Sequence, residues 1–220
     1  MSEEEWLACT NPLGMLAFLR GMVSDRKLRL FAVACCGIVW HLLADDRNRR
    51  AIEIAERLAD GSTDREQLPA VRASLTSVTA WCTIEDSAWD AATRAAQSGA
   101  RDAARSAARD KAWSGREERD AAWWHARAAT RFTQASIFRD IIGTPFRSIA
   151  LAPSWLSWHG GLLVSMARQI YGSHDFADMP ILADALEEAG CTDTDILGHC
   201  RGAGPHVRGC WVVDLILGKS

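Results

Sequence analysis

The sequence has few features of a secreted, membrane-bound or β-rich protein. Its first ten residues, MSEEEWLACT, are acidic, so they lack the basic segment and apolar run of a secretory signal peptide. The longest apolar stretch, residues 28–43, is interrupted by Arg29, Gly37 and His41 and falls short of the roughly 20 apolar residues of a membrane span. Few stretches alternate apolar and polar residues, as half-buried strands would. We therefore expect a cytoplasmic protein with reduced thiols and no membrane partner.

The sequence also lacks a recognisable catalytic signature and a strong charge of either sign. It has seven cysteines but no Cys-x-x-Cys pair, the spacing typical of structural zinc sites. A net charge of −3 argues against a strongly basic protein made chiefly to bind nucleic acid. We therefore assign no catalytic residue and predict no cofactor, with zinc kept open as an alternative.

Helical periodicity, by contrast, extends along almost the whole chain. Apolar residues make up 48% of the 220 residues, enough for a sizeable core, and they recur at helical spacing, as in Leu28, Phe31 and Cys35. Ser24 stands where it would cap one helix, and Asp45 or Asp46 where it would cap the next. The sequence predicts an all-α fold that forms one globular unit.

Three helical segments are expected within that unit. They are an N-terminal helical bundle (residues 1–65), a long Ala/Trp-rich helical hairpin (66–142) and a C-terminal helical cap (143–220). The last helix of the cap is expected to start near Pro205 and to be buried, because it is apolar almost all round.

The hairpin is predicted to turn near Ser114 and Gly115 and to have two unlike sides. One side of its first helix carries small residues, which would let the second helix of the hairpin approach closely. The opposite side carries an arginine stripe, formed by Arg94, Arg101, Arg105 and Arg109. This stripe could bind nucleic acid, but acidic neighbours offset its charge, so we favour a solvated face.

Tryptophan is abundant, with ten residues against a single tyrosine, and five of the ten lie in the hairpin, among them Trp113, Trp123 and Trp124. Adjacent helical residues point about 100° apart, so Trp123 and Trp124 cannot both lie in one buried stripe. We predict that these tryptophans and the arginine stripe form a contact surface for a partner, expected to be another protein.

Residues 191–211, CTDTDILGHCRGAGPHVRGCW, hold three cysteines and two histidines. His206 and Cys210 are four residues apart and would share one face of a helix, with Cys200 on the preceding turn. Zinc bound by Cys200, His206 and Cys210 is one interpretation, and a nucleophilic thiol in a Cys/His pair is another. We favour a third, in which the cysteines pack in the core, because free cysteine is among the most buried residue types.

The same stretch contains a glycine-proline loop. Backbone N–H groups at a helix start could bind an anion there, together with Arg201, Gly204 and Arg208. Glycines before a helix most often serve turn geometry, so we expect a tight loop instead, with Arg208 paired to an acidic residue.

Three stretches of the chain resemble a known group of proteins: residues 3–36, 140–158 and 180–219. They contain EEEWLACTNPLGMLAFLRGM, DIIGTPFRSIALAPSWLSW and PILADALEEAGCTDTDILGHC, and they resemble a large paralogous family of uncharacterised proteins from planctomycete bacteria of the Gemmata type. The resemblance implies a bacterial lineage and a shared scaffold, with a middle part that varies among relatives. It implies no activity.

Taken together, these features favour a non-enzymatic protein-interaction or adaptor protein. One alternative is a small zinc- or thiol-dependent enzyme centred on Cys200, His206 and Cys210. A second alternative is nucleic-acid binding through the arginine stripe. The sequence predicts no particular oligomeric state.

Overall fold

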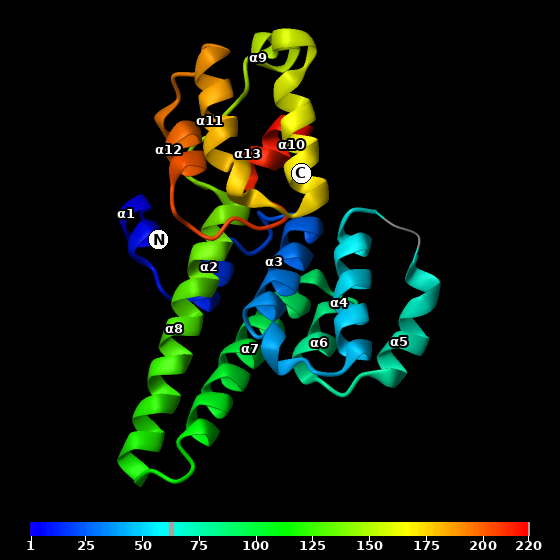
Figure 1. Ribbon diagram of the computed structural model, residues 1–220, viewed down its shortest axis with the longest axis vertical. Helices are drawn as coiled ribbons and strands as arrows, with labels where there is room; N and C mark the ends of the chain where they lie inside the picture. The colour runs from blue at the N-terminus through cyan, green and yellow to red at the C-terminus, as the bar shows by residue number, and fades with distance from the viewer. Residues whose placement is uncertain (62–63, 220) are drawn as a thin grey trace. The chain divides into compact units, whose positions relative to one another are not determined.

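The computed structural model describes residues 1–61 and 64–219, and the regular secondary structure of these residues is helical, without a β-strand (Figure 1). The all-α fold predicted from the periodicity is therefore confirmed. In the described part of the chain, no helix combines the length and the apolar character needed to cross a lipid bilayer. Contacts between residues divide the chain into two compact units, Met1–Ser136 and Ile137–Ser220.

The first unit consists of short helices followed by two long ones. Its helices are α1 (Glu3–Ala8), α2 (Pro12–Phe18), α3 (Asp25–Ile38), α4 (Asp46–Ala59), α5 (Leu68–Ser74), α6 (Val78–Thr83), α7 (Ala88–Asp110) and the greater part of α8 (Arg116–Ile142). Short 3-10 segments lie at Trp40–Leu42 and Asp64–Gln67. The three-segment division expected from the sequence stays a prediction, and residues 62–63 of its first segment lie outside the described residues.

Several of these helices begin at residues whose side chains satisfy free backbone N–H groups. Ser24 Oγ accepts a hydrogen bond from the N–H of Lys27 at 3.4 Å, and Asp45 caps α4 in a similar way. The cap predicted at Ser24 is confirmed, and of the two residues considered for the start of α4, Asp45 is the cap. Ser87 caps the long helix α7. Each cap satisfies a donor that the first turn of a helix leaves without a partner.

The small-residue side of α7 faces α3. The buried residues of α7 are alanine, serine and glycine: Ala88, Ala91, Ala92, Ala95, Ala96, Ser98, Gly99, Ala100 and Ala104. A Cβ atom on Gly99 would lie 3.3 Å from the carbonyl oxygen of Cys35, so the two backbones nearly touch. The sequence predicts α8 as the helix that packs on this side; the structure shows α3 there as well.

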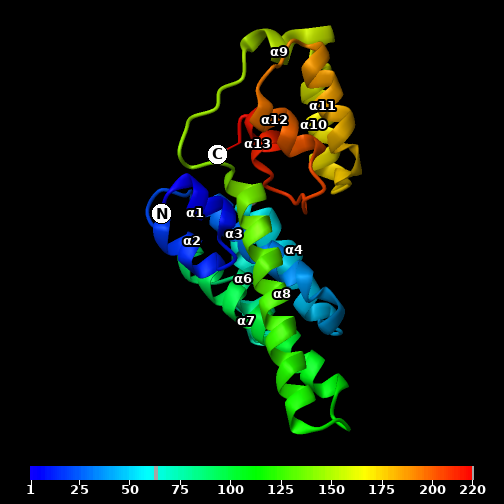
Figure 2. The same cartoon turned by 90° about the vertical axis from the view of Figure 1, so that its left-hand side faces the viewer.

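Helices α7 and α8 run antiparallel and side by side, as both views show (Figures 1 and 2). The turn between them follows Asp110 and includes Ser114 and Gly115, as predicted. A hydrogen bond of 3.0 Å from Nε2 of the buried Gln134 to the carbonyl oxygen of Ala96 ties the two helices together. The predicted helical hairpin is thus formed by α7 and α8, with α5 and α6 preceding it.

The second unit begins with the last turns of α8 and continues through α9 (Pro153–Ser157), α10 (Leu162–Ser173), α11 (Met179–Glu188), α12 (Thr194–Arg201) and α13 (Trp211–Leu217). Short 3-10 segments lie at Trp158–Gly160 and Phe176–Asp178. Helix α10 packs against α11 and α13, and α12 against α11 and α13. The core between them is apolar and includes Leu163, Ile170, Met179, Leu182, Leu186, Ile196, Val212, Val213 and Ile216.

The last helix is buried, as predicted, but it starts later in the chain than predicted. Helix α13 begins at Trp211 rather than near Pro205, and residues 203–210 are not helical. Gly209 has a φ of +96°, in the left-handed region that glycine tolerates. This φ is incompatible with a right-handed helix that continues from Pro205 through Gly209. His206 therefore lies in a loop, and Cys210 stands at the N-cap of α13.

Candidate metal centre

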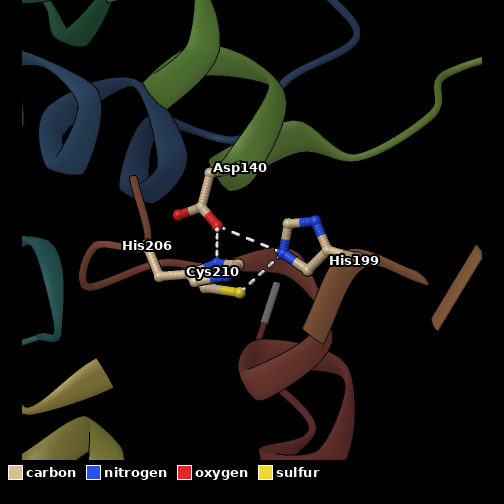
Figure 3. Close-up of side chains that lie close together, drawn as sticks. All are labelled: Asp140, His199, His206 and Cys210. Carbon is tan, nitrogen blue, oxygen red and sulfur yellow. Dashed lines mark hydrogen bonds and ion pairs between the residues drawn. The ribbon is translucent and has the colours of Figure 1, made fainter. Parts of the chain in front are cut away.

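Four side chains from separate parts of the second unit converge on one point (Figure 3). Asp140 lies in the last turn of α8, His199 in the last turn of α12, His206 in the loop after α12 and Cys210 at the start of α13. Each residue offers one potential ligand atom, and these atoms all lie within 4.8 Å of one another. We refer to these four residues as the Asp-His-His-Cys cluster.

The contacts within the cluster centre on the Asp140 carboxylate. Its Oδ1 lies 2.7 Å from Nδ1 of His206 and 3.1 Å from Nε2 of His199. Its Oδ2 accepts a hydrogen bond of 2.9 Å from the backbone N–H of Val207. The same Nε2 of His199 also lies 3.1 Å from Sγ of Cys210. One carboxylate thus holds both histidines and the loop that carries His206.

The local sequence explains how α12 presents His199. The Asp193 carboxylate accepts hydrogen bonds from the N–H groups of Asp195 and Ile196, which fixes the start of α12. The helix is short, so His199 comes in its last turn. The ring of His199 lies across from that of His206, with centroids 4.8 Å apart in an edge-to-face arrangement.

A close approach between α8 and α13 sets the distance between Asp140 and Cys210. Gly143, directly after α8, has a φ of +73°, and a Cβ atom there would lie 2.9 Å from the indole of Trp211. The missing side chain lets Trp211, the first residue of α13, pack on the end of α8. The ring of Trp211 also contacts that of His199, with centroids 5.2 Å apart.

The cluster is largely buried, and its charges depend on one another. The side chains of Asp140, His206 and His199 are 3%, 8% and 18% exposed. Burial by itself raises the pKa of Asp140, but hydrogen bonds to His199 and His206 and their positive charges outweigh it, so the pKa is lowered. Burial lowers the pKa of His206, and the hydrogen bond to Asp140 outweighs it, so that pKa is raised. The negative charge of the Asp140 carboxylate therefore stabilises a positive charge on the neighbouring imidazole of His206.

The thiol of Cys210 is fully buried, and burial raises its pKa well above the ordinary value. The negative charge of Asp140 adds to this rise. The backbone N–H groups of Val213 and Val212 oppose it, because they point at the sulfur from the first turn of α13. Without a cation, Cys210 is a neutral thiol; a bound metal ion would displace the proton, and the same N–H groups would then stabilise the thiolate.

The arrangement differs from that of a catalytic cysteine. In a Cys-His-Asp triad the acid holds one ring nitrogen and the nucleophile faces the other. Here Cys210 and Asp140 both contact Nε2 of His199. A buried thiol with a raised pKa is also a poor nucleophile at neutral pH. The geometry therefore favours a shared cation over a nucleophilic thiol.

Of the three zinc ligands considered from the sequence, the structure brings His206 and Cys210 together, and it places Cys200 elsewhere. Cys200 lies in the apolar core, where burial raises its pKa to about 12. His199 takes part instead, since adjacent helical residues diverge and only one of the two can face the cluster. Asp140 precedes His206 by 66 residues, and no sequence signal links the two.

The residues considered for anion binding are engaged within the chain. Arg201 forms ion pairs with Asp184 at 2.8 Å and with Glu187 at 2.6 Å. Arg208 lies 2.9 Å from Nε2 of His174, and its guanidinium group stacks on the ring of Tyr171. Gly204 is exposed in the loop before His206. The two guanidinium groups thus contact different neighbours, and the anion site stays a prediction.

The residues of the predicted partner surface are mostly exposed. The four arginines of the stripe, Arg94, Arg101, Arg105 and Arg109, are exposed on α7. Two of them contact acidic residues, Arg94 with Glu85 at 2.7 Å and Arg105 with Asp102 at 3.7 Å. Trp113 is fully exposed in the hairpin turn, Trp124 is 60% exposed and Trp123 is partly buried.

Comparisons with protein-family models, with curated proteins and with solved structures give no match to this chain, so the resemblance to the planctomycete proteins stays a prediction.

Proposed function

We propose that this protein binds zinc, and that Asp140, His199, His206 and Cys210 hold the ion as a structural centre. One observation carries the proposal: Nε2 of His199 lies 3.1 Å from both Sγ of Cys210 and Oδ1 of Asp140. A ring nitrogen has one N–H or one lone pair, so it bonds well to only one of these atoms. A cation between the donors would satisfy all of them.

The donor types favour zinc over other divalent ions. Thiolate and imidazole ligands suit zinc, whereas magnesium and calcium prefer oxygen ligands throughout. In a tetrahedral zinc site, bonds of about 2.0–2.3 Å place the ligand atoms roughly 3.3–3.8 Å apart. The short donor contacts are 2.7 and 3.1 Å, and all four donor atoms lie within 4.8 Å of one another, so shifts of about 1 Å that open the short contacts and close the longer separations would fit the ion.

The ion is proposed to be structural rather than catalytic. Four protein ligands would complete a tetrahedron, whereas catalytic zinc keeps one position for water. The ligands would join α8, α12, the loop after it and α13, which are separate in sequence. Because the unfolded chain has no such site, binding energy would stabilise the folded second unit.

The first test is metal content measured by mass spectrometry of protein purified without a metal-affinity tag. The expected result is about one zinc ion per chain, lost in Cys210→Ser and His206→Ala. Cys9→Ser and His41→Ala are the matched controls, because Cys9 and the exposed His41 lie in the first unit, outside the cluster. Zinc that is absent from the wild-type protein after zinc addition, or retained in Cys210→Ser, would overturn the proposal.

A second function is favoured by the exposed tryptophans of the hairpin. We infer that the protein is a non-enzymatic interaction protein of the cytoplasm, and that α7 and α8 supply its contact surface. Trp113 in the turn is fully exposed, and Trp124 on α8 is 60% exposed. Aromatic residues are enriched at the centres of protein interfaces. The test is recovery of a partner from native lysate by wild-type protein, and its loss with Trp113→Ala or Trp124→Ala, while Trp40→Ala, outside the hairpin, retains it.

A further inference from the structure

Helix α8 carries an exposed stripe that the metal centre does not involve. Five residues recur at intervals of three or four and therefore share one face of the helix. They are Glu117, Ala121, Trp124, Ala128 and Phe132, and all five are exposed. Trp124 is 60% exposed and Phe132 is 57% exposed, which is unusual for large apolar side chains. We call these five residues the α8 stripe.

The ring of Trp124 is held in place before any partner binds. It packs edge-to-face on the ring of Trp123, with centroids 4.6 Å apart. The guanidinium group of Arg127 lies over both rings, 5.0 Å from the centroid of Trp123 and 5.7 Å from that of Trp124. An exposed aromatic side chain that is already ordered loses little conformational entropy on binding.

Charge along the stripe changes from acidic to basic. Glu117 belongs to its first turn and Asp120 lies beside it, whereas Arg127 and Arg131 lie beside its second half. Burial and the neighbouring charge of Arg127 lower the pKa of Arg131, as expected of two cations close together. Asp120 contacts Arg116 at 3.7 Å, but both side chains are largely exposed, so this pair is weak.

This order of charges is complementary to itself. When two copies of the stripe lie antiparallel, the acidic end of each meets the basic end of the other, whereas a parallel pair places like charges together. The small side chains fit the same arrangement. A twofold axis at Trp124 brings Glu117 of one copy opposite Arg131 of the second copy and Trp124 opposite Trp124, and the small residues Ala121 and Ala128 on either side leave room for the indoles.

We propose that the α8 stripe binds the α8 stripe of a second copy of this chain, antiparallel and about a twofold axis. This rests on the proposed role of the hairpin as a contact surface, and it names the partner. The stripe spans about 24 Å of helix at 1.5 Å per residue. A single helix face of this length covers less area than the roughly 800 Å² per partner that stable complexes bury. The dimer is therefore weak and forms in the micromolar range.

Sedimentation equilibrium over protein concentrations from about 5 to 500 μM tests the proposal. The wild-type protein is expected to pass from monomer to dimer, and Trp124→Glu to stay monomeric. Ile181→Glu is the matched control, because Ile181 is a similarly exposed apolar residue, 58% exposed, on α11 of the second unit and is not part of the stripe. Circular dichroism of each variant shows that it has folded. A monomeric wild-type protein throughout this range, or a dimer that persists in Trp124→Glu, would overturn the proposal.

A charge exchange tests the antiparallel arrangement separately. Arg131→Glu places acidic residues at both ends of the stripe and is expected to weaken the dimer at least about tenfold. The double variant Glu117→Arg, Arg131→Glu restores opposite ends and is expected to recover most of the affinity. A double variant as weak as Arg131→Glu would contradict the arrangement. A different protein captured from lysate by a monomeric wild-type chain, and lost in Trp124→Glu, would leave the hairpin as a contact surface and overturn self-association.

Discussion

Asp140 and His206 are joined by a contact of 2.7 Å between Oδ1 of the carboxylate and Nδ1 of the imidazole. The contact brings a loop residue to the end of α8, which precedes it by 66 positions in the sequence. It also places a negative charge at the centre of a buried group whose other members are His199 and Cys210. Positive charge is held there by a protonated histidine in the metal-free protein, and by the ion in the proposed zinc-bound protein.

The metal-free protein is expected to depend on pH through this pair. The pKa of His206 is raised on folding, so its contribution is present below its unfolded pKa, about 6.5, and is lost as the pH rises through the folded value. The pKa of Asp140 is lowered, so its contribution is present above about 3.9 and is lost as the pH falls through the folded value. The pair should stabilise the chain most at about pH 5 to 6.

Urea unfolding with a chelator present measures this. His206→Gln should lower the free energy of unfolding by more at about pH 5.5 than at about pH 8.5, because the contribution of the ion pair falls as the pH rises through the folded pKa of His206. An equal loss at the two pH values would show that packing, rather than charge, accounts for the effect of His206.

Asp140→Asn removes the charge and keeps nearly the same shape. We expect the free energy of unfolding to fall by about 3 kcal/mol in the metal-free protein, since one partner of a buried charged pair is lost, and we expect zinc binding to weaken strongly. Asp184→Asn is the control, because its ion pair with Arg201 is exposed to solvent and contributes little to stability. Equal effects of the two substitutions would argue against a charged cluster.

Gly143→Ala tests whether the approach of α13 to α8 positions the cluster. Gly143 and Gly218 both have positive φ values, 73° and 64°, so alanine at either position is strained by about 1–2 kcal/mol. Only at Gly143 would the new Cβ also meet the ring of Trp211, at 2.9 Å; at Gly218 no atom lies within 4 Å. Gly143→Ala should therefore destabilise the protein more than Gly218→Ala in thermal unfolding and should also weaken zinc binding. Equal zinc affinity in the two variants would remove this positioning role.

Thiol labelling distinguishes a structural centre from a catalytic cysteine. Cys9 is partly exposed, and the other six cysteines, Cys210 among them, are buried. We expect Ellman's reagent to label Cys9 quickly in the folded protein and the remaining thiols only as the chain unfolds. Fast labelling of Cys210 at neutral pH would instead support the thiol-enzyme alternative.

Much of the fold follows from local patterns in the sequence. Ser24 and Asp45 cap helices because short polar side chains reach free N–H groups, and this needs no information from distant residues. The small-residue side of α7 is likewise visible as a periodicity. The sequence does not say which helix packs there, because any close backbone satisfies a face of alanine and glycine.

The site could be predicted only in part. His206 and Cys210 belong to a recognisable Cys/His cluster, although the positive φ of Gly209 makes their surroundings a loop rather than the expected helix. Asp140 is one acidic residue among 28 aspartates and glutamates, and only the folded chain brings it to the two histidines. Ligands that tertiary structure assembles from distant segments leave no spacing to recognise.

X-ray absorption at the zinc edge of the loaded protein identifies the atoms bound to the ion. We expect four-coordinate zinc with one sulfur at about 2.3 Å and nitrogen or oxygen ligands at about 2.0–2.2 Å, including two imidazoles. The sulfur should disappear in Cys210→Ser and remain in Cys9→Ser. A spectrum without sulfur, or with six oxygen or nitrogen ligands, would contradict a zinc centre at Asp140, His199, His206 and Cys210.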